Sequence, residues 1–350
     1  MLLGTLTVGL GVAGCGGHTT HTTQSSPTGT ATGSTPSSSA ESPTRATGSP
    51  AVVASGIPFP VNLAFDSSGR LWVGSGAAGT STLPGEGIWY VPAGGAPRRV
   101  AGGLPAAGAL TWIGDRLDVG NNVAPGQGQI TVLSGFTGTE FTGRHVLVAG
   151  LNDGSHIISA IVPGASGLIY TPLGAAGDHS GPPGNIVSVS TSGGTPTVVA
   201  TGIGDVFGLA FWGQRLLVTL PGPHIPEAPP SRLQSFAPGG QVVDFGFPKC
   251  YGQEGSACAP YPAPLAILPA HSAPTSVVVK GDVAYVAENG SSTPGYPVSS
   301  QIERVDLRTG DVNVFWRSPV AHDLVDLALG PDGNLYAALF VSGKVVRLDL

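Results

Sequence analysis

Short apolar runs separated by polar turns recur along the whole chain. The first example is LAFDSSGRLWV at residues 63–73, in which a turn containing Gly69 separates two apolar runs. Five further segments repeat this pattern, at residues 110–119, 158–170, 209–218, 276–286 and 327–337. The runs are too short for helices, and Gly, Asp and Pro favour tight turns, so each segment predicts an antiparallel hairpin.

The hairpins return at a regular interval. The first residues of the second runs lie 46 to 67 positions apart: Leu71, Leu117, Leu168, Leu216, Val283 and Leu335. A weaker strand pair follows most copies, such as GIWYV and RRVAGG after the first, or RLQSF (232–236) and QVVDF (241–245) after the fourth. Four strands in each period of this length are typical of a propeller blade. The sequence therefore predicts an all-β fold, a six-bladed β-propeller.

The last predicted blade lacks one strand. After Leu335 the chain supplies only KVVRLDL before its last residue, Leu350. An apolar stretch at Ala51–Ala54, AVVA, precedes the first hairpin and could complete this blade. We therefore expect an N-terminal strand to close the ring, which would leave few open sheet edges.

Composition and charge agree with this fold class and exclude one class of partner. The 350 residues include 55 Gly and 32 Pro, and only 10% are charged. Such a composition favours many turns and short strands, and no segment shows a helical period. The net charge is −6 and the Lys and Arg residues are scattered, so nothing indicates binding to nucleic acid. We expect a monomer.

The first 14 residues are apolar and end in Val12-Ala13-Gly14 before Cys15. This pattern resembles the lipobox of bacterial lipoprotein signal peptides, although no Lys or Arg precedes the apolar run. The resemblance implies that residues 1–14 are removed, that Cys15 is acylated, and that the protein is held at the bacterial cell membrane, facing the extracytoplasmic side. Residues 15–50 would then begin with the lipidated cysteine and continue as a disordered Ser/Thr/Pro-rich tether. Residues 51–350 would form the propeller.

The two remaining cysteines, Cys250 and Cys258, lie in one Gly-rich loop, PKCYGQEGSAC. An exported domain lies in an oxidising compartment, so the pair favours a local disulfide. A zinc site is the alternative, with His271 as the next candidate ligand along the chain.

Several segments resemble the glucose/sorbosone dehydrogenase family of quinoprotein propellers. In order, they are a histidine segment ending at His156, GIGDVFGLAF (202–211), FGFPKCYG (245–252) and PAHSAP (269–274). The resemblance implies an oxidoreductase that uses pyrroloquinoline quinone (PQQ) and calcium and oxidises a sugar, aldose or polyol.

Site residues follow from the same resemblance. His156 would be the general base that takes the hydroxyl proton of the substrate, His271 would lie near the cofactor, and the backbone of Gly222 and Pro223 would hold calcium. One segment departs from the family pattern. Where the family has Arg-Asn to hold the anionic quinone, this chain reads GDVFG at 204–208, with an acidic residue in place of a cation.

Two other functions remain open from the sequence. One is a non-catalytic propeller that binds carbohydrate or a cell-envelope protein. The other is a calcium-dependent hydrolase or lactonase, for which the acidic candidates are few: Asp153, Asp205 and Asp323. His322 and Asp323 are neighbours before the sixth hairpin, but adjacent side chains on a strand point apart, so they do not predict a catalytic dyad.

Overall fold

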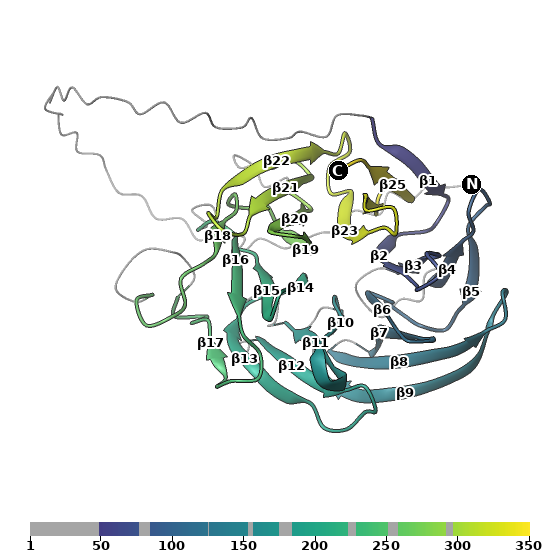
Figure 1. Cartoon of the computed structure of the whole chain (residues 1–350), viewed down its shortest axis with the longest axis horizontal. Helices are drawn as coiled ribbons and strands as arrows, with labels where there is room; N and C mark the ends of the chain where they lie inside the picture. The colour runs from purple at the N-terminus through teal and green to yellow at the C-terminus, as the bar shows by residue number, and fades with distance from the viewer. Residues whose placement is uncertain are drawn as a thin grey trace, which may run out of the picture. The chain divides into compact units, whose positions relative to one another are not determined.

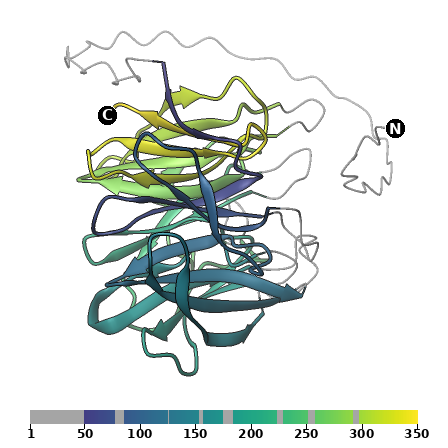
Figure 2. The same cartoon turned by 90° about the vertical axis from the view of Figure 1, so that its right-hand side faces the viewer.

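A computed structural model describes residues 49–76, 85–124, 126–152, 157–174, 184–222, 229–250, 258–291 and 297–350. Residues Pro43–Leu350 form a compact unit of their own, which contains every described strand. These strands are arranged as six sheets around an axis, seen end-on in Figure 1 and from the side in Figure 2. The predicted all-β, six-bladed propeller is confirmed.

The first three blades follow the repeat. Blade 1 contains β2 (Pro60–Phe65), β3 (Leu71–Ser75), β4 (Gly87–Val91) and β5 (Arg98–Ala101). Blade 2 contains β6 (Ala109–Ile113), β7 (Arg116–Ala124), β8 (Gln127–Phe136) and β9 (Phe141–Leu151). Blade 3 contains β10 (Val162–Pro163), β11 (Leu168–Leu173), β12 (Gly184–Ser190) and β13 (Thr197–Ile203), with a short 3-10 turn at Ala165–Gly167.

The remaining blades complete the ring. Blade 4 contains β14 (Leu209–Trp212), β15 (Arg215–Leu220), β16 (Arg232–Phe236) and β18 (Ala266–Ile267). Blade 5 contains β19 (Pro274–Lys280), β20 (Val283–Glu288), β21 (Gln301–Asp306) and β22 (Val312–Arg317). Blade 6 contains β23 (Leu324–Leu329), β24 (Leu335–Leu339), β25 (Lys344–Leu348) and β1 (Ala51–Ser55). β1 pairs antiparallel with β25, so the predicted closure by the N-terminal strand is confirmed.

One predicted strand lies in a different sheet. The sequence placed QVVDF (241–245) next to RLQSF within blade 4, but β17 (Val243–Asp244) pairs parallel with β13 of blade 3. The fourth strand of blade 4 is instead β18, which follows the disulfide loop. Phe245, next to β17, is buried in the apolar cluster between blades 3 and 4, and its N–H donates to the carbonyl of Thr201 in β13, which continues the pairing with blade 3.

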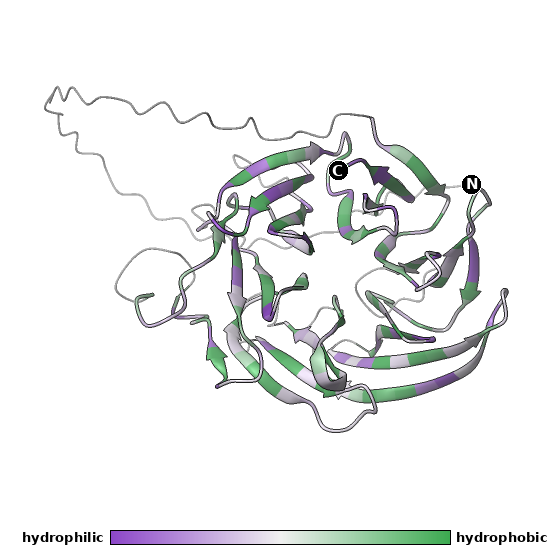
Figure 3. Ribbon diagram, viewed as in Figure 1, coloured by the Kyte–Doolittle hydropathy of each residue, from purple (hydrophilic) through white to green (hydrophobic). Residues whose placement is uncertain are grey.

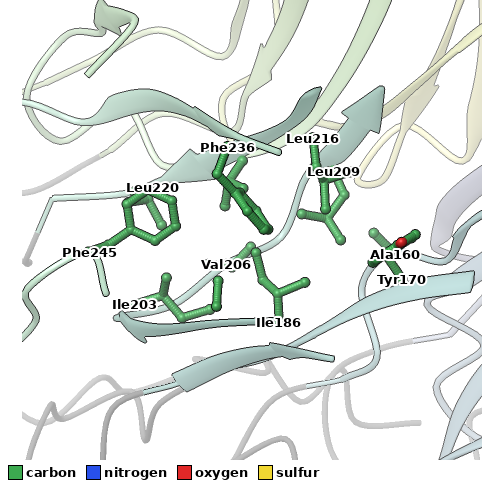
Figure 4. Close-up of a cluster of buried hydrophobic side chains, with 12 residues drawn as sticks. Ala160, Tyr170, Ile186, Ile203, Val206, Leu209, Leu216, Leu220, Phe236 and Phe245 are labelled. Atoms are coloured by element: carbon green, nitrogen blue, oxygen red, sulfur yellow. The ribbon is translucent and has the colours of Figure 1, made fainter. Parts of the chain in front are cut away.

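The buried apolar side chains gather between blades rather than in one central core. Each of the six seams between neighbouring blades holds one cluster. The cluster between blades 3 and 4 includes Ile186, Ile203, Leu216 and Phe236 (Figure 4). The hydropathy colouring of Figure 3 shows green segments on the strands of every blade. The alternation within each strand therefore buries one set of side chains against the next blade.

Polar side chains near the axis join the blades at the same six seams. Asn62 accepts a hydrogen bond from Leu110 N, Ser276 from Leu327 N and Asp326 from Leu63 N. These three residues occupy equivalent positions in their repeats. The other three blades carry Ala109, Ala160 and Gly208 there, and their seams are bridged by Asn122, Ser159 and Thr219. Six blades thus share six polar bridges in addition to the apolar contacts.

The predicted disulfide between Cys250 and Cys258 is present and closes a separation of eight residues. Within the residues that the structure describes, no helix has the length and apolarity needed to cross a bilayer.

Candidate functional site

A cavity of about 330 Å³ lies on the axis, at the end of the ring where the innermost strands begin. Each blade contributes one residue to its wall from an equivalent position near the start of its innermost strand: Val61, Gly108, Ser159, Phe207, Thr275 and Val325. Phe340, Val341 and Ile157 add further apolar surface. The hairpin turns that define the repeat lie at the opposite ends of these strands.

Three polar residues of blades 5 and 6 complete the lining: Asn289, His322 and Asp326. His322 Nδ1 lies 3.2 Å from Asn289 Oδ1, and Asn289 Nδ2 donates to the carbonyl of Leu324 at 3.1 Å. His322 has a φ of 55°, a left-handed conformation that the neighbouring structure imposes. These contacts hold the imidazole against the amide at the cavity wall.

Asp326 lines this cavity and also a smaller one of about 120 Å³. Burial raises its pKa to about 7, although hydrogen bonds from Ser276 and from the Leu63 and Leu327 backbone act in the opposite direction. Protonation of a buried carboxyl removes the cost of burying its charge. Asp326 therefore holds a proton through much of the range below neutral pH, and the cavity base then carries no charge.

A second group of buried carboxyls lies next to Asn289 in blade 5. The Gln301 amide donates to Glu288 Oε2 at 3.0 Å and to Glu303 Oε1 at 2.7 Å. Burial and then the nearby Glu303 raise the pKa of Glu288 to about 8. Burial also raises the pKa of Glu303, against the effect of Arg317. This group lies within the sheet and is not part of the cavity lining.

The structure describes only some of the site residues that were expected from the sequence. His156 and Pro223 lie outside the described residues, as do Asp153 and Cys15. Gly222 is described, and its N–H donates to Ser231 Oγ at 3.1 Å. No group of three or more His, Cys, Asp or Glu suited to a metal ion is found among the described residues.

His271 is buried, with 4% of its surface exposed, and has a φ of 60°. It is not among the residues that line the cavity. The carbonyl of the next residue, Ser272, accepts a hydrogen bond from Gly290 N, which fixes this segment beside the Asn289 turn. Asp205, in the segment that departs from the family pattern, also lies off the cavity wall, whereas its neighbour Phe207 lies on it.

His322 and Asp323 have different partners, as expected, but they lie in the turn before β23 and not on a strand. Asp323 is buried and accepts hydrogen bonds from Ser342 N and Ser342 Oγ at 2.7 and 2.6 Å. His322 is turned to the cavity. The sequence reasoning did not select Asn289 or Asp326. The recurrence of polar residues at positions 62, 276 and 326 was the signal that would have identified Asp326 as an axial residue.

The solved structures most useful for comparison are sugar-oxidising propellers. The chain is similar to the PQQ-bound aldose sugar dehydrogenase of Streptomyces coelicolor, with 20% identity, a TM-score of 0.66, and coverage of 87% of this chain and 99% of that one. For a family AA12 carbohydrate-active enzyme of Trichoderma reesei, the identity is 14% and the TM-score is 0.69, with coverage of 86% of this chain and 95% of that one. For the soluble aldose sugar dehydrogenase of Escherichia coli in its apo form, the identity is 13% and the TM-score is 0.62, with coverage of 86% of this chain and 99% of that one. No family model and no curated protein matches the chain.

These similarities establish the fold: a six-bladed propeller like that of the soluble quinoprotein sugar dehydrogenases. They cover the blades almost completely, which agrees with the resemblance drawn from the sequence.

The cavity lining nevertheless does not suit PQQ, which carries several carboxylates. No Lys or Arg is found among the described residues that line the cavity. Between residues 49 and 350, the segments outside the described ranges contain no Lys or Arg either: 77–84, 125, 153–156, 175–183, 223–228, 251–257 and 292–296. A polyanion buried without cationic partners would bear a large desolvation cost. The residues present therefore do not fit this cofactor.

Proposed function

We propose that this chain is an exported, lipid-anchored propeller that binds a small uncharged molecule in its axial cavity and does not use a quinone cofactor. The observation that carries the proposal is a cavity of about 330 Å³ with apolar walls from five blades and no cationic side chain in its described lining. Apolar clefts and cavities with a few convergent polar groups are the usual form of a small-molecule site.

Of the non-catalytic ligands considered from the sequence, a carbohydrate fits this cavity poorly. The hydroxyls of Ser159 and Thr275 already donate to the carbonyls of Val206 and Ala287. A sugar carries hydroxyls on most of its carbons, and apolar walls would leave most of them without partners.

The second candidate is a PQQ-dependent sugar or polyol dehydrogenase with His156 as its base. It is favoured by the similarity in fold to the PQQ-bound enzyme of Streptomyces coelicolor. The departure from the family pattern at 204–208 and the absence of Lys and Arg from the described cavity lining disfavour this candidate.

A thermal melt distinguishes the two candidates. We expect PQQ with calcium to leave the melting temperature of the purified protein unchanged. A functional cofactor site at one hundred times its dissociation constant would raise the free energy of unfolding by about 2.7 kcal/mol, which a melt resolves. Such a rise, together with dye-linked oxidation of a sugar that His156→Ala abolishes, would replace the binding proposal by the dehydrogenase. Calcium alone serves as the control.

The anchor is tested separately. We expect Cys15→Ser to prevent acylation and to move the protein from the membrane fraction to the soluble extracytoplasmic fraction. Stable membrane attachment of a domain of this kind needs buried acyl chains. Incorporation of labelled palmitate is the measurement, and unchanged labelling in Cys15→Ser would contradict the proposed anchor. Cys250→Ser, within the disulfide loop, is the control that should retain the label.

A further inference from the structure

The hydrogen bonds around Asn289 determine which nitrogen of His322 carries its proton. Asn289 Nδ2 donates to the carbonyl of Leu324, an acceptor that fixes the orientation of the amide. Asn289 Oδ1 then faces His322 Nδ1 at 3.2 Å. A carbonyl oxygen can only accept, so Nδ1 must bear the hydrogen. In the neutral imidazole, Nε2 is therefore an acceptor with an available lone pair.

Three other polar side chains of the cavity make hydrogen bonds within the fold. Ser159 Oγ and Thr275 Oγ1 donate to backbone carbonyls, and Asp326 Oδ2 accepts from Leu63 N. Among the described residues, no hydrogen-bond partner is found for His322 Nε2. His322 Nε2 is consequently a nitrogen acceptor in the described lining that a ligand can use without displacing a bond between blades.

The remaining surface is apolar. Phe207, Phe340, Val325 and Val341 face the same space, and Phe340 packs on Phe59 with ring centroids 5.1 Å apart. A flat or branched hydrocarbon body would bury its surface against these side chains.

We propose that the axial cavity takes an alcohol or phenol with a compact apolar body, whose single hydroxyl donates to His322 Nε2. This inference rests on the binding function proposed above and adds the class of ligand. A ligand without a donor would bury Nε2 unsatisfied, and a ligand with many hydroxyls would bury those groups unsatisfied. The site therefore selects one donor on an apolar body.

The test compares phenol with anisole, its methyl ether, which has nearly the same shape and no donor. Titrations followed by saturation-transfer NMR at pH 7 give the affinity of each probe for the same protein sample. We expect phenol to bind about tenfold more tightly than anisole, the size of effect typical of one buried hydrogen bond. The ratio is taken within one sample, so a loss of folded protein does not change it.

Variants assign the preference to the imidazole. His322→Asn keeps a residue type that tolerates the positive φ at this position but shortens the side chain, and should reduce the ratio to about one. Asn289→Ala removes the group that fixes the tautomer and should lower the ratio as well. His145→Asn, on the exposed outer strand β9, is the matched control and should leave the ratio unchanged.

The outcomes separate this inference from the function on which it rests. Equal affinity for both probes, or a tenfold preference that persists in His322→Asn, would overturn the role of His322 and leave a binding cavity in place. Failure of both probes to bind at millimolar concentration would overturn the binding function together with the inference.

Discussion

At the scale of single residues, the axis of this propeller is defined by polar side chains in apolar surroundings. Asn62, Ser276 and Asp326 occupy one repeat position and make the same bond to the next blade. Asp326 differs from the others because it is an acid, and its pKa of about 7 makes its charge depend on pH near neutrality.

This acid should make the protein more stable as the pH falls from 8 to 5. The folded carboxyl, with a pKa of about 7, keeps a proton that the unfolded chain, with a pKa near 3.8, has released. Stability decreases with rising pH wherever the folded state binds more protons, here between about pH 4 and 7. Glu288, with a pKa raised from 4.5 to about 8, adds a change of the same sign. Melting temperatures from pH 5 to 8 measure the effect.

The variant Asp326→Asn keeps an oxygen for Leu63 N and never carries a charge. We expect it to melt a few degrees higher than the wild type at pH 8, to match it near pH 5, and to show a shallower dependence on pH. Glu288→Gln should reduce the remaining dependence independently. A lower melting temperature of Asp326→Asn at pH 8 would contradict the assignment.

At the scale of elements, neighbouring blades are held by one apolar cluster and one polar bridge at each seam. Trp72 illustrates the apolar part. It is fully buried between blades 1 and 2, its ring packs on Tyr90, Trp112, Phe136 and Phe141, and its Nε1 donates to Asp66. The aromatic side chains fill the seam. The hydrogen bond from Leu110 to Asn62, near the axis, fixes the position of β6 relative to β2.

Removal of one bridge should weaken the ring measurably. In Asn62→Ala, the N–H of Leu110 stays buried and loses its acceptor, which should lower the free energy of unfolding by about 1–3 kcal/mol. Urea titration is the measurement. Asn313→Ala, on the outer strand β22, should change the free energy by less than about 0.5 kcal/mol. Equal effects of the two substitutions would show that the bridge does not stabilise the seam.

At the scale of the whole molecule, β1 joins the beginning of the propeller to its end. Residues 51–55 pair with residues 344–347 of β25 and form the outer strand of blade 6, so without them the edge of β25 would be exposed. Open strand edges pair with other chains, so closure protects the ring as well as stabilising it.

A chain that begins at Gly56 should therefore melt several degrees lower and self-associate. A chain that begins at Pro43 keeps β1 and is the control. Light scattering during size-exclusion chromatography and a thermal melt report both properties. A monomeric Gly56 chain with an unchanged melting temperature would show that β1 is dispensable.

The fold was predictable because its signal is local and repeated. Short apolar runs joined by turns such as that around Gly69 mark hairpins, and six copies require a closed arrangement of blades. Strand partners across long loops were less predictable. The segment 241–245 has the pattern of a strand, but its pairing with blade 3 depends on where Phe245 finds a buried site.

The candidate site was predictable only in part. The sequence by itself determined the repeat and the local disulfide, because each depends on residues that are close in the chain. It also indicated the closing strand, because the last repeat is one strand short and an apolar segment precedes the first repeat. The tertiary structure alone decided that His322, Asn289 and Asp326 meet at one cavity and that His271 is not part of its lining. These residues belong to different blades or loops, and their proximity arises only when the ring closes around the axis.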